Sequence, residues 1–327
     1  GTSASASNGS YVSLDRYITN VSGGGAYTFS QETDTPSGQG FKNSMKVNVD
    51  TADSSIASAD YYIIQYRIEG QNVAHLMLGT SDAVKVTLSF WVKSSLTGNF
   101  GASFINSAAN RSYPFQYNIS SANTWQKITK TVQLDTSGTW LTDNGIGLKV
   151  LFDFGSGTTY QGTADAWAGA NYHTASSSVQ LIGTASATWY LTGLQLEVGS
   201  TATPFEHRSY GDELLRCQRY LYRLVPDVDA GAFVSLTGWN TNDSYGPILY
   251  PVEMRAAPTL SIGAEPADFL ILSAGTNPTV TELYSNGSSK RMMELRVSST
   301  GNIVAGRPYW GRIIDTTNGY IQWDAEL

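Results

Sequence analysis

The stretch from Tyr160 to His173 carries the combination of side chains that binds a sugar. Aromatic rings lie against the C–H face of a pyranose, while amides and acids hydrogen-bond to its hydroxyls. The stretch has few apolar residues, and its candidate contact residues are Tyr160, Asp165, Trp167, Asn171, Tyr172 and His173. The sequence therefore predicts a carbohydrate contact here. The alternative is a loop folded back on the protein, with Trp167 as its buried plug.

Two further positions are candidates for ligand contact. The hairpin-like connection at 106–113 would place Arg111 and Tyr113 at a rim, unless these residues only stabilise the loop. Trp91 falls on the polar face of its strand, so it either lines a concave sheet face or is covered by a loop or subunit. The remaining tryptophans in strand-like runs are expected in the core or an interface: Trp125, Trp140, Trp189 and Trp323.

Catalytic motifs are missing from the chain, and we expect no enzyme. It contains no G-x-S-x-G, P-loop or H-E-x-x-H pattern. A glycosidase needs two carboxylates across the scissile bond, and sequence spacing singles out no such pair. The candidates by residue type alone are Asp60, Glu69, Asp153, Asp165 and Glu197.

Metal-binding patterns are equally weak, so no cofactor is expected. The only cysteine, Cys217, and three separated histidines do not provide zinc-site spacing. A structural calcium ion is the one alternative, because Asp50, Asp53 and Asp60 cluster between two predicted strands. A solvated acidic loop is the competing interpretation.

The charge balance excludes several classes of partner. Charged residues make up 14% of the chain, and 20 Lys+Arg against 27 Asp+Glu give a net charge of -7, so there is no basic field for nucleic acid. No run of about 18 apolar residues predicts membrane insertion, and no signal peptide is recognisable. The start at Gly1 suggests a chain cut from a longer polypeptide.

The distribution of apolar residues predicts an all-β protein of two domains. The length of 327 residues exceeds one ordinary domain. Short apolar runs broken by Gly, Ser, Thr, Asn and Asp indicate a sandwich over 1–208, and the clearest strand is 84–92, with alternate residues facing the core. A smaller β domain is predicted over 226–327.

The pattern between these domains predicts a connecting helix at 209–225. Ser209 with Asp212 three residues later resembles a capping box, and Pro226 would stop the helix. The apolar stripe falls three and four residues apart, at Leu214, Cys217, Leu221 and Leu224.

Several idiosyncratic motifs resemble those of phage tail-fibre and virion-appendage proteins. The longest is Trp189–Gly199 followed by 202–208, and Glu213-Leu214 and Cys217-Gln218-Arg219-Tyr220 come after it. Others look like the carbohydrate-binding-module-like jelly roll and the C-terminal domain of the same family: 68–72, 87–92, 123–125, 254–258 and 324–327.

This resemblance implies a homotrimeric adhesin on the virion surface, either a tail fibre or a head spike or fibre. It implies a bacterial surface polysaccharide as partner, and attachment to other virion proteins through an upstream part. Three alternatives stay open: a depolymerase of the same glycan, a purely structural virion-decorating protein, and a secreted carbohydrate-binding module. The identity of the sugar is not encoded in any motif.

Overall fold

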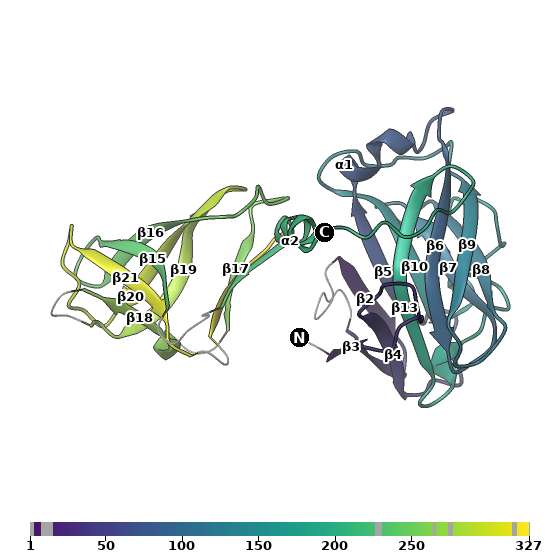
Figure 1. Ribbon diagram of the computed structural model, residues 1–327, viewed down its shortest axis with the longest axis horizontal. Coiled ribbons are helices and arrows are strands. Elements are labelled where there is room, and N and C mark those ends of the chain that lie inside the picture. The colour runs from purple at the N-terminus through teal and green to yellow at the C-terminus, as the bar shows by residue number, and fades with distance from the viewer. Residues whose placement is uncertain are drawn as a thin grey trace. The chain divides into compact units, whose positions relative to one another are not determined.

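Figure 1 shows the computed structural model of the chain, which describes residues 3–7, 16–225, 231–263, 266–273, 277–315 and 319–326. The chain folds into two compact units, whose boundary lies between His207 and Arg208. Both units are built of antiparallel sheets, so the predicted all-β architecture is confirmed: a jelly-roll sandwich, a short helix and a smaller β domain. The start at Gly1 and the helix stop at Pro226 lie outside the described residues.

The first unit is a sandwich of two sheets. The six-stranded sheet has the order β1 (Ser3–Ser5), β3 (Ala26–Glu32), β4 (Ser44–Thr51), β13 (Thr188–Val198), β6 (Lys85–Ser94), β9 (Gln126–Gln133). The five-stranded sheet has the order β2 (Tyr17–Ser22), β5 (Tyr61–Glu69), β10 (Ile146–Ser156), β7 (Gly98–Ile105), β8 (Ser112–Ile119).

Strand β6 shows why the sequence folds in this way. Val86, Leu88, Phe90 and Val92 alternate along it and are all fully buried, as the two-residue period predicts. The other face of β6 points away from the core and carries Trp91 among polar residues.

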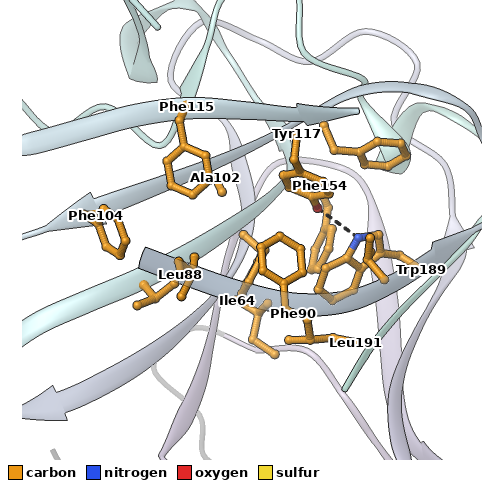
Figure 2. Packing of buried hydrophobic residues seen from close by; sticks show 14 of the residues in the cluster. Ile64, Leu88, Phe90, Ala102, Phe104, Phe115, Tyr117, Phe154, Trp189 and Leu191 are labelled. Atoms are coloured by element: carbon orange, nitrogen blue, oxygen red, sulfur yellow. Dashed lines mark hydrogen bonds between the residues drawn. The ribbon is translucent and has the colours of Figure 1, made fainter. Parts of the chain in front are cut away.

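The core between the two sheets is aromatic (Figure 2). Trp189 of β13 and Tyr117 of β8 belong to opposite sheets, and the Trp189 indole Nε1 donates a hydrogen bond to the Tyr117 hydroxyl at 3.0 Å. Around this pair, Phe90 meets Phe152 edge-to-face at 5.2 Å between ring centroids. Trp189 is fully buried, so its predicted place in the core is confirmed.

Short elements connect the strands of this sandwich. Helix α1 (Gly70–Val73) runs directly into the 3₁₀ turn η1 (Ala74–Leu76). The remaining 3₁₀ turns and the small parallel pair are η2 (Thr158–Tyr160), β11 (Gln161–Gly162), β12 (Thr174–Ala175) and η3 (Leu181–Gly183).

The connecting helix is shorter than predicted. Helix α2 covers Tyr210–Gln218, and the Ser209 hydroxyl caps it by accepting the Asp212 backbone N–H at 3.2 Å. Strand β14 (Leu221–Leu224) follows it and pairs with β22 (Tyr320–Asp324), so the predicted helical extent to 225 was wrong. Pairing with a distant strand outweighed the local helical period.

The second unit contains two sheets. The three-stranded sheet places β22 between β14 and β17 (Thr259–Gly263). The six-stranded sheet has the order β18 (Phe269–Leu272), β21 (Pro308–Ile313), β15 (Gly231–Gly238), β16 (Asp243–Leu249), β20 (Met292–Ser299), β19 (Val280–Ser288), and the 3₁₀ turn η4 (Pro266–Asp268) precedes β18.

Trp323 of β22 is fully buried in the second unit's own core, where the Tyr222 ring stacks on it with centroids 5.4 Å apart.

None of the helices in the described part of the chain is long and apolar enough to cross a membrane.

Candidate functional site

The stretch from Tyr160 to His173 folds back along the edge strand β8. Ala168 and Ser112 exchange two backbone hydrogen bonds of 2.9 and 3.1 Å, and the Ser112 hydroxyl donates to the Ala170 carbonyl at 2.7 Å. These bonds fix the loop against the sandwich, because an edge strand has unpaired backbone groups to offer.

His173 lies beneath this loop and not on its surface. Its side chain is 3% exposed, and its ring stacks on Tyr160 with centroids 4.3 Å apart. Burial, assisted by the charge of Lys149, lowers the pKa of His173 to about 3, so the ring is neutral at ordinary pH. A ring so enclosed has no face for a sugar, and the predicted contact through His173 does not fit its placement.

Trp167 packs against the protein as a plug, which is the alternative to sugar contact. Its indole Nε1 donates to the Gln133 carbonyl at 2.8 Å. Its ring packs on Tyr113 at 5.1 Å and edge-to-face on Trp140 at 5.6 Å. Tyr113 is therefore part of this packing, and Trp167 is half-buried against the main core.

The charged candidates are held in ion pairs. Arg111 makes a bidentate pair with the buried Asp135, with Nε–Oδ2 and Nη2–Oδ1 distances of 2.6 and 2.8 Å. Asp165 Oδ1 lies 2.5 Å from Lys130 Nζ. A side chain so engaged positions a loop and keeps less capacity for a ligand.

Asn171 and Tyr172 are half-buried. The Tyr172 backbone N–H donates to the Ser112 hydroxyl at 3.0 Å, and its ring lies over Gly162, where an added Cβ would come within 2.3 Å of it. Sugar contact by these two residues and Tyr160 stays a prediction.

The three aspartates considered for calcium do not converge. Asp53 accepts the Tyr62 hydroxyl at 2.7 Å and the Ser55 N–H, while Asp60 accepts the Ala57 N–H at 3.1 Å. Asp50 lies on β4 and accepts the Asn48 side-chain amide at 2.9 Å. Within the described ranges, no three His, Cys, Asp or Glu residues form a group that would hold a metal ion.

A different surface gathers aromatic and polar side chains: the outer face of the six-stranded sheet. There Trp91 of β6 stands directly opposite Lys127 of β9 in the antiparallel register. Cross-strand partners have Cβ atoms about 4.5–5.5 Å apart, so the two side chains leave the sheet as neighbours on one face.

Trp91 and Lys127 line a pocket of about 190 Å³, which we call the aromatic pocket. Trp91 is half-buried and Lys127 is exposed. The complete lining is Gly38, Gln39, Phe41, Ser89, Trp91, Lys127, Gly193, Pro204, Phe205 and His207.

One wall of the aromatic pocket is the loop 33–43. Asp34 fastens this loop to the sheet, because its carboxylate accepts the Trp125 indole N–H at 3.0 Å and forms an ion pair with Lys93. The hydrogen bonds from Lys93 and then Trp125 hold the pKa of Asp34 below its usual value. The Ser44 hydroxyl donates to the Asp34 carbonyl at 2.6 Å and closes the end of the loop.

The opposite wall is the segment 199–207. Gln195 accepts the Glu206 backbone N–H at 2.8 Å, and Glu197 accepts the Thr203 backbone N–H at 3.1 Å. Burial of Glu197 would raise its pKa, but hydrogen bonds from Thr203 and Gln195 and the charge of Lys127 outweigh it, so the pKa lies below its usual value. Both side chains come from β13, which therefore positions this wall.

An aromatic cluster joins the two walls. The Phe41 and Phe205 rings meet at 5.0 Å, and His207 lies 5.3 and 5.0 Å from them. The cluster sits over a bulge in β13 at Gly193, where φ is +62° and an added Cβ would lie 2.5 Å from Phe41 Cζ. Glycine is required here for both the left-handed backbone and the close approach of the ring.

Among these residues, the sequence pointed only to Trp91 as a possible contact. The signal for Phe41 was present, because it lies in the polar turn sequence TPSGQGFKNS, the same setting that marks the 160–173 stretch. Phe205 and His207 lie inside the 202–208 motif, which the sequence marked only as part of a family resemblance. No local pattern shows that residues 41, 91 and 205 meet, because they come from separate segments that become neighbours only in the folded sheet and its loops.

Comparison with known proteins finds similarity only to solved structures. No family model matches the chain, and no curated protein matches it. One similar structure is the enzymatically active domain of tailspike protein 4 of bacteriophage CBA120, with 13% identity over 59% of this chain and a TM-score of 0.35; the match covers 21% of that domain.

Other similar structures include carbohydrate-binding modules. The family 11 module of the cellulosomal cellulase Lic26A-Cel5E of Clostridium thermocellum is 12% identical over 59% of this chain and 92% of its own, with a TM-score of 0.31. The tandem CBM22-1–CBM22-2 domain of Paenibacillus barcinonensis Xyn10C is 8% identical, covering 94% of this chain and 93% of its own, with a TM-score of 0.28.

Proposed function

We propose that this protein is a host-attachment adhesin of a phage or phage-like particle that binds polysaccharide on a bacterial surface, and that the sugar occupies the aromatic pocket. The observation that carries the binding proposal is the pairing of the half-exposed Trp91 with Lys127 inside a walled depression on a polar sheet face. The phage assignment is supported by the resemblance of the sequence motifs.

The chemistry of the pocket suits a pyranose. The Trp91 indole provides a flat apolar face for the sugar C–H bonds, while Lys127, Ser89 and the Gln39 amide are hydrogen-bonding groups of the lining. The volume lies below the roughly 300–1,000 Å³ of typical ligand sites, so the pocket would take about one sugar residue of a longer chain.

A single small site of this kind binds weakly, and attachment requires several sites. If the chain is a homotrimer, three pockets would act on one repetitive polysaccharide, and the effective concentration of the second and third sites would supply the avidity. Adhesion needs no bond cleavage, so no enzyme is proposed.

Affinity electrophoresis in gels containing bacterial capsular or lipopolysaccharide glycans tests the site. We expect retardation of the wild-type chain, and loss of at least about tenfold in affinity for Trp91→Ala. Tyr172→Ala in the 160–173 stretch is the matched control and should bind as wild type, with circular dichroism confirming the fold of both variants. Full binding by Trp91→Ala with loss in Tyr172→Ala would move the site to that stretch.

Two measurements test the wider proposal. Light scattering of the purified chain should give the mass of a trimer, and a monomer would favour a solitary binding module. Release of new reducing ends from a bound glycan would replace adhesion with depolymerisation, and failure to bind any bacterial glycan would favour a structural appendage.

A further inference from the structure

We infer that the aromatic pocket selects an acidic glycan, with a carboxylate, phosphate or sulfate group of the sugar bound by Lys127. This inference rests on the proposed function, since it names the class of sugar that the same pocket would take. It stands on the charge and geometry of the lining and the hydrogen bonds around it.

The lining of the pocket is electrostatically one-sided. Lys127 is its only residue with a formal charge at neutral pH, and no Asp or Glu belongs to the lining. An ammonium without an ion-pair partner attracts anions more strongly in a depression than on a flat surface, because low-dielectric walls focus its field. A neutral sugar would offer no charge to pair with the Lys127 ammonium.

Two other lysines on this sheet face are already paired with carboxylates. Lys93 is paired with Asp34, and Lys46 Nζ lies 3.9 Å from Glu32. For Lys127, no carboxylate oxygen of the described part of the chain comes within ion-pair distance, and its ammonium donates a long hydrogen bond of 3.4 Å to the Thr203 carbonyl. An ammonium carries three donors, so capacity remains for a ligand.

The nearest acid is engaged elsewhere. Glu197 uses Oε2 to accept the Thr203 backbone N–H at 3.1 Å and Oε1 to accept the Thr203 hydroxyl, so both oxygens serve the pocket wall. Glu197 therefore holds the wall in place and forms no ion pair with Lys127, although the Lys127 charge helps to lower its pKa.

The position of Lys127 relative to Trp91 defines how such a sugar would lie. The two residues are direct cross-strand partners on adjacent strands. A pyranose stacked on the indole would carry its ring-edge substituent beside the ammonium. An anionic substituent there gains a charge-assisted hydrogen bond, the stronger class of such bonds.

Paired polysaccharides test the inference on the full chain. The probes are polygalacturonate, hyaluronan, alginate and polysialic acid, each beside its carboxyl-reduced neutral form, together with the bacterial glycan found to bind and its carboxyl-reduced or dephosphorylated form. We expect binding to acidic forms, weakened by raising the salt, and a loss of about tenfold or more in Lys127→Gln with partial rescue in Lys127→Arg. Lys85→Gln is the control, because it removes one positive charge from the same sheet face outside the pocket lining.

The outcomes separate the inference from the proposed function. Equal binding of acidic and neutral forms, or of wild type and Lys127→Gln, with loss in Trp91→Ala, would overturn the acidic ligand and leave the sugar site standing. Equal losses in Lys127→Gln and Lys85→Gln would show non-specific charge attraction and would also overturn it. Binding that is indifferent to Trp91→Ala would remove the pocket itself.

Discussion

The indole Nε1 of Trp125 donates a hydrogen bond to Asp34 Oδ1 at 3.0 Å, although 91 positions separate them in the chain. Asp34 begins the loop that walls the aromatic pocket, and Trp125 stands just before β9, the strand that carries Lys127. Lys93 completes the junction, since its ammonium pairs with Asp34 and lies 4.2 Å from the centroid of the Tyr190 ring. The Asp34 carboxylate therefore links the loop wall of the pocket to β6, through Lys93, and to the start of β9, through Trp125.

Asp34→Asn should loosen this wall. The amide keeps a carbonyl for the Trp125 indole but loses the charge that holds Lys93, so the loop has more freedom when no sugar is bound. Sugar affinity should fall roughly threefold to tenfold, the cost of reordering a loop on binding. The thermal midpoint should fall as well, because the substitution leaves the buried Lys93 ammonium without its anionic partner.

Titration of the bound glycan against Asp34→Asn and Glu32→Gln measures this effect. Glu32 is the matched control, because it pairs with Lys46 on the same sheet face and is not part of the pocket lining. Equal affinities for both variants would show that Asp34 does not position the wall.

Gly193→Ala should displace the Phe41 ring that lines the pocket. The substitution forces alanine into a left-handed backbone at a φ of +62°, which costs about 1–2 kcal/mol, and its Cβ would collide with Phe41. The melting temperature should fall, and sugar binding should weaken as the Phe41 ring shifts. Gly306→Ala incurs the backbone cost alone, since its φ is +77° with no atom within 4 Å of the added Cβ. Unchanged sugar binding in Gly193→Ala would mean that the aromatic cluster does not shape the site.

Tyr117→Phe tests the polar link across the core. It leaves the Trp189 indole N–H buried without its hydroxyl partner, and such an unsatisfied donor costs about 1–3 kcal/mol. Urea unfolding should show a lower midpoint with an unchanged slope. Trp189→Phe with the double variant completes a thermodynamic cycle, and additive effects would show that the hydrogen bond contributes nothing.

Two buried groups beneath the 160–173 stretch respond to pH in opposite directions. Burial raises the pKa of Asp153 from 3.8 to about 7, although hydrogen bonds from Ser156, the Gly155 backbone and Thr174 oppose it. Its contribution to stability is present below about pH 4 and is lost as pH rises to 7. Burial lowers the pKa of His173 from 6.5 to about 3. Its contribution to stability is therefore present above pH 6.5 and is lost as the pH falls toward 3.

Melting temperatures of single variants between pH 4 and 7 separate these contributions. Relative to wild type, Asp153→Asn should lose stability as the pH falls, because the His173 contribution is then uncompensated. His173→Gln should gain stability over the same range. The titration of Lys149, with a pKa lowered to about 8 by burial and by Arg67, lies above this window. Parallel pH profiles for the wild type and both variants would contradict the opposing titrations.

The sequence by itself determined the strand content and the faces of the strands. Alternation along 84–92 placed Phe90 in the core and Trp91 on the opposite face, and the structure agrees, because successive side chains of a strand point to opposite faces of the sheet. The helix cap at Ser209 was equally local, since the hydroxyl and the N–H that it accepts are three residues apart.

Only the tertiary structure decided where Leu221–Leu224 would go and which aromatic residues share a pocket. The first depended on an antiparallel partner strand, β22, that is distant in the chain, and the second on register across β6, β9 and β13. Trp167 and Phe41 look alike in the sequence, as aromatics in polar loops, yet one packs against the core and the other lines the aromatic pocket. Long-range pairing sets these outcomes, because residues far apart in the chain become neighbours only when the strands that carry them align.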